Sequence, residues 1–204
     1  MITIDCTRPS KLFRYARCRW NVKSLFAGEF RLVPASEYGE LKGDAARQDN
    51  ELVREETSPG GKVTVTHVAT GKPIRVIGDV TYRHEVGTDY YILCFSSTWD
   101  PPLFEEFKES NSCLVIHNTE EFCDRVHFHA EKLLKEWAGI DAAVSYLAKS
   151  QLGSAFSKHW KFLPQKEWRF AWYPPAQVEK LPVKFISIGN IEQFAEIVRR
   201  PEVR

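Results

Sequence analysis

Residues 161–174 read K-F-L-P-Q-K-E-W-R-F-A-W-Y-P, and the alternation that begins at Gln165 decides the predicted fold. Side chains two residues apart lie on the same face of a β-strand, so this period predicts a strand with two unlike faces. The aromatic face carries Trp168, Phe170 and Trp172, and the other carries Gln165, Glu167, Arg169 and Ala171. The aromatic face is typical of a core. The polar face is either solvated, with a surface ion pair, or presents the Glu167 carboxylate into a cleft.

A second strand is predicted upstream, over residues 89–98, D-Y-Y-I-L-C-F-S-S-T. Its nearly continuous apolar run indicates a central strand buried on both faces. The run ends in three hydroxyls, Ser96, Ser97 and Thr98, and two prolines follow at 101 and 102. Hydroxyls in this position either cap a turn or orient a ligand, and both interpretations stay open.

A third strand is predicted over residues 11–16, K-L-F-R-Y-A, which places Arg14 on the face opposite Phe13 and Tyr15. A guanidinium on the inner side of a strand needs an anionic partner, because burying an unpaired charge is costly. We expect a helix over residues 20–28 that ends at Gly28, and then a strand over residues 30–34.

The remaining pattern predicts a helix that begins at Asn118 or Thr119 and ends at Gly139. His127 and His129 would lie about 200° apart on it, so we expect no metal site there. Further strands are expected at residues 113–117 and 183–188, a hairpin between 63–68 and 74–84, and helices at about 44–55 and at 191–200.

Composition and charge bound the function. The chain has 204 residues, 43% of them hydrophobic, and a net charge of +1, which suits one domain over residues 1–204 and argues against bulk polyanion binding. The absence of a long apolar run and of signal-peptide features predicts a cytoplasmic protein with no membrane contact. Five scattered cysteines without a C-x-x-C pair predict reduced thiols and no zinc site. Basic residues cluster from Arg8 to Arg31, where only Glu29 opposes them, and could hold phosphates.

Three short motifs in order resemble a widespread bacterial family of unknown function, whose members open with K-Y-R, carry a central C-F-S strand and end with K…E-x-E-Y-R. The motifs here are K-L-F-R-Y at residues 11–15, I-L-C-F-S at 92–96 and K-H-W…Q-K-E-W-R-F at 158–170. The resemblance spans most of the chain. The asparagine-aspartate-proline segment common after the second strand is replaced by S-E-Y-G-E-L-K-G-D at residues 36–44.

The same motifs resemble the arginine, serine-threonine-serine and glutamine/glutamate-x-glutamate motifs of ADP-ribosyltransferases, with Ser-Ser-Thr here in place of Ser-Thr-Ser. This resemblance implies that Arg14 holds the NAD phosphates and that Ser96 orders the nicotinamide-ribose pocket. It also implies that Glu167 is the catalytic glutamate and that Gln165 faces the acceptor. The expected NAD-binding set is completed by Tyr15, Ser97, Thr98 and Arg169.

The residue types suit this chemistry. Cleavage of the nicotinamide–ribose bond develops positive charge on the ribose, which a carboxylate such as Glu167 can stabilise. The fork of Arg14 can bind pyrophosphate oxygens in pairs. Aromatic side chains such as Tyr15, Tyr38 and Trp99 could stack on nicotinamide or adenine, although core packing is their commoner use.

We therefore predict an α+β fold: a single domain with a bent or split, mainly antiparallel sheet and flanking helices, similar to ADP-ribosyltransferases. Arg14, Ser96 and Glu167 should converge on one cleft, with Arg14 and Glu167 on the same face of the sheet. Glu167 on the face opposite Arg14 would argue against the transferase. The expected function is NAD-dependent mono-ADP-ribosyl transfer, without a metal, to a protein or nucleic acid, as a bacterial toxin or phage-defence effector with an antitoxin as partner. Two alternatives stay open: a non-catalytic nucleotide- or nucleic-acid-binding module using residues 8–31, and a metal-independent nuclease using His and Glu residues.

Overall fold

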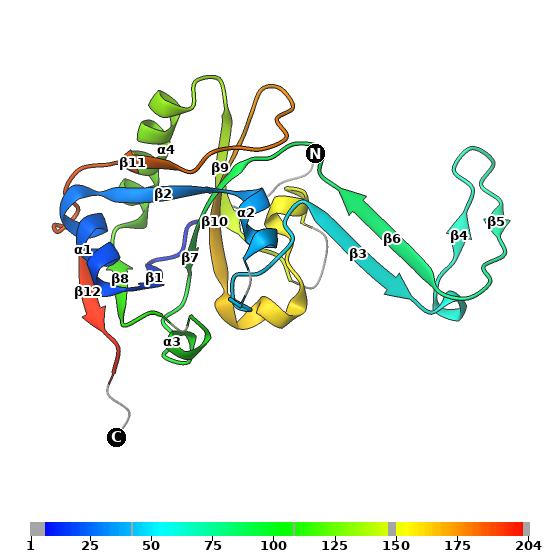
Figure 1. Ribbon diagram of the computed structural model, residues 1–204, viewed down its shortest axis with the longest axis horizontal. Helices are drawn as coiled ribbons and strands as arrows, with labels where there is room; N and C mark the ends of the chain where they lie inside the picture. Colours follow the sequence, from blue (N-terminus) through cyan, green and yellow to red (C-terminus); the bar gives the residue numbers. More distant parts are fainter. Residues whose placement is uncertain (1–6, 42, 108, 147–149, 202–204) are drawn as a thin grey trace.

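The computed structural model describes residues 7–41, 43–107, 109–146 and 150–201, and Figure 1 shows their arrangement. The chain forms an α+β domain in which helices flank a mainly antiparallel sheet of eight strands. The strands of this sheet are β1 (Leu12–Ala16), β2 (Glu29–Pro34), β7 (Tyr91–Ser96), β8 (Ser112–Ile116), β9 (Ala138–Ala143), β10 (Glu167–Tyr173), β11 (Lys184–Ser187) and β12 (Ala195–Arg199). The helices are α1 (Cys18–Ala27), α2 (Ala35–Glu40), α3 (Leu103–Glu106) and α4 (Thr119–Leu133), with short 3-10 turns η1 (Gly60–Lys62), η2 (Ser154–Phe156) and η3 (Trp160–Gln165).

Strand β7 is the centre of the sheet, as its apolar run predicts. One edge of β7 pairs with β10 along its whole length, from Tyr91–Trp172 to Ser96–Glu167. The other edge pairs with two strands in turn: β2 through Tyr91 and Ile92, and β1 at Ser96. The predicted split in the sheet is therefore confirmed, and it lies between β1 and β2.

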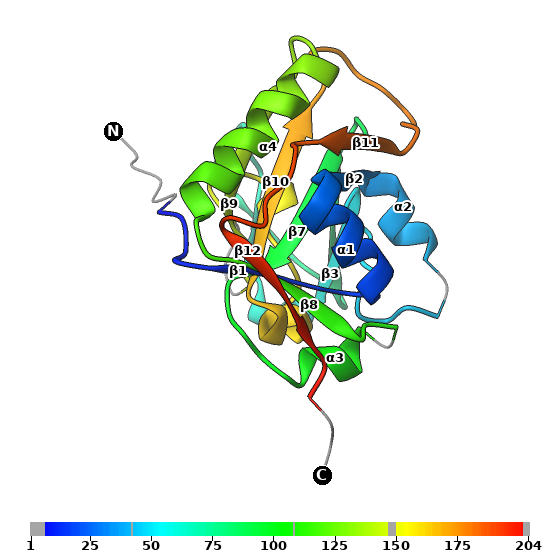
Figure 2. The same cartoon turned by 90° about the vertical axis from the view of Figure 1, so that its left-hand side faces the viewer.

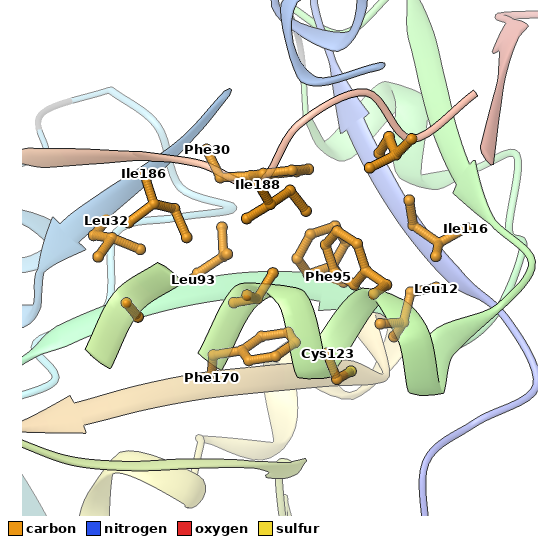
Figure 3. Close-up of a cluster of buried hydrophobic side chains, with 14 of the residues drawn as sticks. Leu12, Phe30, Leu32, Leu93, Phe95, Ile116, Cys123, Phe170, Ile186 and Ile188 are labelled. Carbon is orange, nitrogen blue, oxygen red and sulfur yellow. The ribbon is translucent and has the colours of Figure 1, made fainter. Parts of the chain in front are cut away.

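The main core lies between α4 and one face of the sheet, and Figure 2 shows α4 alongside β10. Helix α4 contributes Phe122, Val126 and Ala130, which contact the aromatic face of β10 predicted from Trp168, Phe170 and Trp172. Figure 3 shows the inner part of this cluster, in which Phe95 and Phe170 lie beside the helix that carries Cys123. The amphipathic stripe of the helix is thus sufficient to explain its position.

Helix α1 ends where the sequence predicts. Gly28 caps it in the left-handed conformation with φ of 60°, and its amide donates to the carbonyl of Lys23. A Cβ at this position would lie 2.1 Å from the Gly189 carbonyl oxygen, so glycine is required by space as well as by backbone conformation.

Three sequence-based assignments are wrong. Residues 191–200 form β12 rather than a helix, because pairing with the free edge of β8 outweighs their helical period. Residues 44–55 form turns and the start of β3 (Val53–Ser58), which pairs with β6 (Val80–Glu85). Helix α4 ends at Leu133, and Ala138 and Gly139 already belong to β9.

The second region of β structure is an arm. The β3–β6 hairpin leads into a smaller pair, β4 (Val65–Thr66) with β5 (Pro73–Ile74), in place of the single hairpin predicted between residues 63–68 and 74–84. Figure 1 shows this ribbon projecting away from the sheet, with β4 and β5 at its far end. No helix in the described ranges has both the length and the apolar character that crossing a bilayer requires.

Candidate functional site

A cavity of about 580 Å³ opens where β1 and β2 separate along β7. Its walls come from these three strands, from the start of β10 and from the segment around residues 44–47. The volume falls in the range typical of small-molecule sites, which is on the order of 300–1,000 Å³. Of the predicted site residues, Arg14, Tyr15, Ser96, Gln165, Glu167 and Arg169 line this cavity.

Arg14 has no carboxylate partner among the described residues. Its Nη1 donates to Ser24 Oγ at 2.7 Å, and its guanidinium lies 5.5 Å from the centre of the Phe30 ring. Burial, with the nearby positive charge of Arg47 in addition, lowers the pKa of Arg14 to about 10. The positive charge of Arg14 therefore lacks a nearby negative charge, and an anion bound in the cavity would supply one.

The other arginines at the mouth of the cavity are already paired. Arg31 bonds Glu37 at 2.7 Å, and Arg47 bonds Asp44 at 2.7 Å. Arg17 forms an ion pair with Glu109. Arg14 therefore differs from these described arginines, because its guanidinium has no carboxylate partner and can still bind an anion.

Glu167 belongs to a buried chain of alternating charges. Its Oε1 accepts from Arg169 Nε at 2.6 Å and its Oε2 accepts from Lys158 Nζ at 3.0 Å. Arg169 also makes two bonds of 2.7 Å to Glu51. Burial alone would raise the pKa of Glu167, but the charges of Arg169 and Lys158 hold it well below its ordinary range. The carboxylate is thus ionised at neutral pH although only 6% of the residue is exposed.

The registers place Arg14 and Glu167 on opposite faces of the sheet, so the expectation of a shared face is wrong. Phe13, Ser96 and Glu167 are directly paired across β1, β7 and β10, and directly paired residues point to the same side. Arg14 follows Phe13 and so points to the other side. Both side chains still line one cavity, because β1 pairs with β7 only at Phe13 and diverges from it at Arg14.

The three hydroxyls at the end of β7 serve a turn. Ser96 Oγ donates to the Thr98 carbonyl at 2.8 Å and accepts from the Thr98 amide at 3.2 Å. Ser97 Oγ donates to the Lys166 carbonyl at 2.8 Å. Ser96 lines the cavity, whereas Ser97 and Thr98 are not part of its described lining. The geometry supports the capping interpretation for Ser96 and Ser97.

Gln165 lies at the end of η3 and not in the strand, which begins at Glu167. Its amide donates to the Ala46 carbonyl at 2.7 Å and its oxygen accepts from Lys158 at 3.1 Å. With 5% of the residue exposed, Gln165 does not present a free amide to an acceptor, in contrast to the role that the resemblance implies. It ties the segment around Ala46 to the cavity.

Two predicted NAD-binding residues are used internally. Arg169 is 1% exposed, and its guanidinium is occupied by Glu51, Glu167 and the Ala155 carbonyl. The hydroxyl of Tyr15 accepts from the Asp100 amide at 2.8 Å, and its ring packs on Trp99, Phe104 and Phe107. Arg169 therefore holds Glu167 in place, and Tyr15 is a core residue at the cavity wall.

Comparison of the chain with protein-family models, with curated proteins and with solved structures gives no match. The function of the chain is therefore inferred from the residues of the cavity itself.

Sequence reasoning missed the cations and acids that surround Glu167. Lys158 and Glu51 are buried at 7% and 1% exposure and complete the charge chain. Lys158 belongs to the K-H-W motif that carries the resemblance, so that motif was a usable signal. Glu51 lies in a polar stretch where nothing in the local pattern distinguishes it from a surface residue.

The described histidine side chains lie outside this cavity. His127 Nε2 bonds Asp141 at 2.8 Å in a separate cleft beside Arg8, and no described histidine lines the cavity between β1 and β2. No group of three or more His, Cys, Asp or Glu side chains in the described ranges is placed to hold a metal ion. The nuclease alternative thus has no described histidine in the cavity that Glu167 lines.

Proposed function

We propose that this chain is an NAD-dependent mono-ADP-ribosyltransferase whose NAD lies in the cavity between β1 and β2. The observation that carries the proposal is the pair of groups lining this cavity: the Arg14 guanidinium without a carboxylate partner and the ionised carboxylate of Glu167. One suits a pyrophosphate, and the other suits the positive charge that develops on a ribose as nicotinamide leaves.

In this mechanism Arg14 binds the pyrophosphate with its free donors while Ser24 fixes the other side of the guanidinium. Glu167 stays anionic through the reaction and stabilises the ribose oxocarbenium ion. Lys158 and Arg169 orient the carboxylate. Their positive charges also offset part of its negative charge. Gln165 acts as a positioning residue through Lys158 and Ala46.

The acceptor is a macromolecule, protein or nucleic acid, and the setting is a cytoplasmic bacterial toxin or phage-defence effector with an antitoxin. This part of the proposal rests on resemblance in the motifs and on analogy. The split, mainly antiparallel sheet of the chain is compatible with it.

A second function is favoured by a specific observation. Both oxygens of Glu167 are held by buried cations, and Arg14 points from the opposite face of the sheet. Such a carboxylate can be purely structural, in which case the cavity binds a nucleotide without cleaving it. This alternative uses Arg14 in the same way and differs only at Glu167.

One experiment separates the two. Wild type is mixed with NAD, and thermal unfolding and nicotinamide release are followed in the same samples. The transferase predicts a rise in melting temperature together with nicotinamide release, whereas the binding module predicts the rise alone. Absence of both would contradict each of them.

A further inference from the structure

The outer part of the arm is a basic, two-stranded ribbon. Residues 59–78 contain Lys62, Lys72 and Arg75 and no Asp or Glu. All three cations are exposed, and none of them forms an ion pair with a described residue. The base of the arm differs, because Arg83 there lies within ion-pair distance of both Glu55 and Glu85. Among the described side chains of the arm, the cations without an ion-pair partner thus lie at its outer part.

The basic segment at the N-terminus behaves in the opposite way. Arg8 is bound by Glu120, Asp124 and Asp141. Arg17, Lys23 and Arg31 each have a carboxylate partner as well. Most of the charge that suggested nucleic-acid binding through residues 8–31 is therefore neutralised within the fold, and the arm is the better candidate.

The apolar side chains of the arm lack a core. Val68 is 100% exposed and Ile77 is 87% exposed, and β4 and β5 pair only with each other. The same segment carries threonine hydroxyls at positions 64, 66 and 70. Hydroxyls and cations are the usual donors to phosphate oxygens, and small apolar groups contact thymine methyls at the edges of bases.

We propose that the arm binds double-stranded DNA, with the ribbon formed by β4 and β5 entering the major groove. Strands in a pair lie about 4.8 Å apart, and a two-stranded ribbon fits a major groove about 12 Å wide. The major groove of double-stranded RNA is too narrow and deep for this mode, so DNA is the favoured duplex. This binding is independent of NAD and stands or falls separately from the proposed transfer.

The test is fluorescence anisotropy of the full chain with a labelled mixed-sequence DNA duplex, at salt concentrations from roughly 50 to 200 mM. The arm variant combines Lys62→Gln, Lys72→Gln and Arg75→Gln. The control combines Lys11→Gln, Lys135→Gln and Arg199→Gln, which removes the same charge from exposed positions of the body. Exposed substitutions of this kind leave folding nearly unchanged, which thermal unfolding verifies.

We expect salt-sensitive binding by wild type and by the control. In the arm variant the slope of log K against log salt should shrink by about 2.7, since each phosphate contact contributes about 0.9. That difference corresponds to about 40-fold in affinity across this fourfold range of salt.

Three results would overturn the proposal: no DNA binding by wild type at the lowest salt, an unchanged slope in the arm variant, or an equal loss in the control. Tighter binding of an RNA duplex would contradict the major-groove assignment. A dimer of wild type that the arm variant dissociates would show that the arm contacts a second copy of the chain instead.

Discussion

Lys158 Nζ and Glu167 Oε2 lie 3.0 Å apart in the buried wall of the cavity, where each side chain is 6% exposed. Lys158 Nζ also lies 4.5 Å from the centre of the Phe162 ring. An ion pair this deep ties the stability of the fold to the charge of the proposed catalytic group. Substituting either partner alone can therefore lower activity through lost stability as well as through lost catalysis.

Glu167→Gln should lower both catalysis and stability. If the carboxylate stabilises the ribose cation, nicotinamide release should fall roughly 10²–10³-fold while the NAD-induced thermal shift persists. Because Lys158 and Arg169 lose a buried counter-charge, the free energy of unfolding should also fall by about 3–5 kcal/mol. Denaturant unfolding and nicotinamide release measure the two effects separately.

The double variant Lys158→Met, Glu167→Gln controls for that instability. Removing both charges should cost much less than the sum of the single substitutions, because neither partner is left alone. If this variant is stable and releases nicotinamide at the same measurable rate as wild type, Glu167 is structural and does not stabilise the ribose cation.

Arg14→Met should stabilise the fold and abolish NAD binding. Burial of the charged guanidinium without a carboxylate lowers its pKa to about 10, so the charged form destabilises the ligand-free fold. We expect the free energy of unfolding to rise by about 1 kcal/mol and the NAD-induced shift to disappear. Arg31→Met, at a cavity arginine already paired with Glu37, is the matched control and should keep the shift.

Gln165→Ala should weaken the proposed reaction through position rather than contact. The substitution removes the bond to the Ala46 carbonyl and one of the two oxygen partners of Lys158. Because Lys158 also bonds the Glu167 carboxylate, we expect NAD hydrolysis and transfer to a macromolecular acceptor to fall together. Equal nicotinamide release and transfer in wild type and variant would exclude any part of Gln165 in the reaction.

Asp141 should give the fold a specific acid sensitivity. Burial alone would raise its pKa, but bonds from His127 and Arg8 lower it from 3.8 to about 2. A depressed pKa contributes stability above about 4, here roughly 2 kcal/mol, which is lost as pH falls from about 4 to about 2. Urea unfolding of wild type and Asp141→Asn across this range should therefore converge at the acid end. A constant difference would show that Asp141 titrates normally.

A chelator should leave thermal unfolding and nicotinamide release unchanged, because the proposed chemistry uses only Arg14 and Glu167 charges. Treatment with EDTA followed by dialysis is sufficient for the comparison. A melting temperature that falls and recovers with added zinc or magnesium would contradict this mechanism.

The sequence predicted the parts of the fold that depend on regular burial. Strands β7 and β10 and the start of α4 follow from periodicity that holds for six or more residues. Helix α1 was placed through Gly28, whose conformation is required locally. Strand β12 was missed because its identity depends on the free edge of β8, which no window of the sequence contains.

The candidate site was predictable only in part for the same reason. Alternation in residues 165–171 identified Glu167 and Arg169, but it could not reveal that Lys158 and Glu51 close over them from other segments. It also gave the wrong face for Arg14, because strand order and register come from tertiary pairing.

The split in the sheet leaves part of the main chain exposed to the cavity. Between Ile92 and Ser96, the edge of β7 that faces β1 and β2 has no paired strand in the described structure. Peptide groups on that edge offer donors and acceptors whose identity does not depend on the side chain. A ligand recognised in this way would be insensitive to alanine scanning of residues 93–95. Replacing these amides by esters would detect such recognition. Because main-chain groups do not depend on the side chain, related chains could keep this mode of binding without sharing a sequence motif.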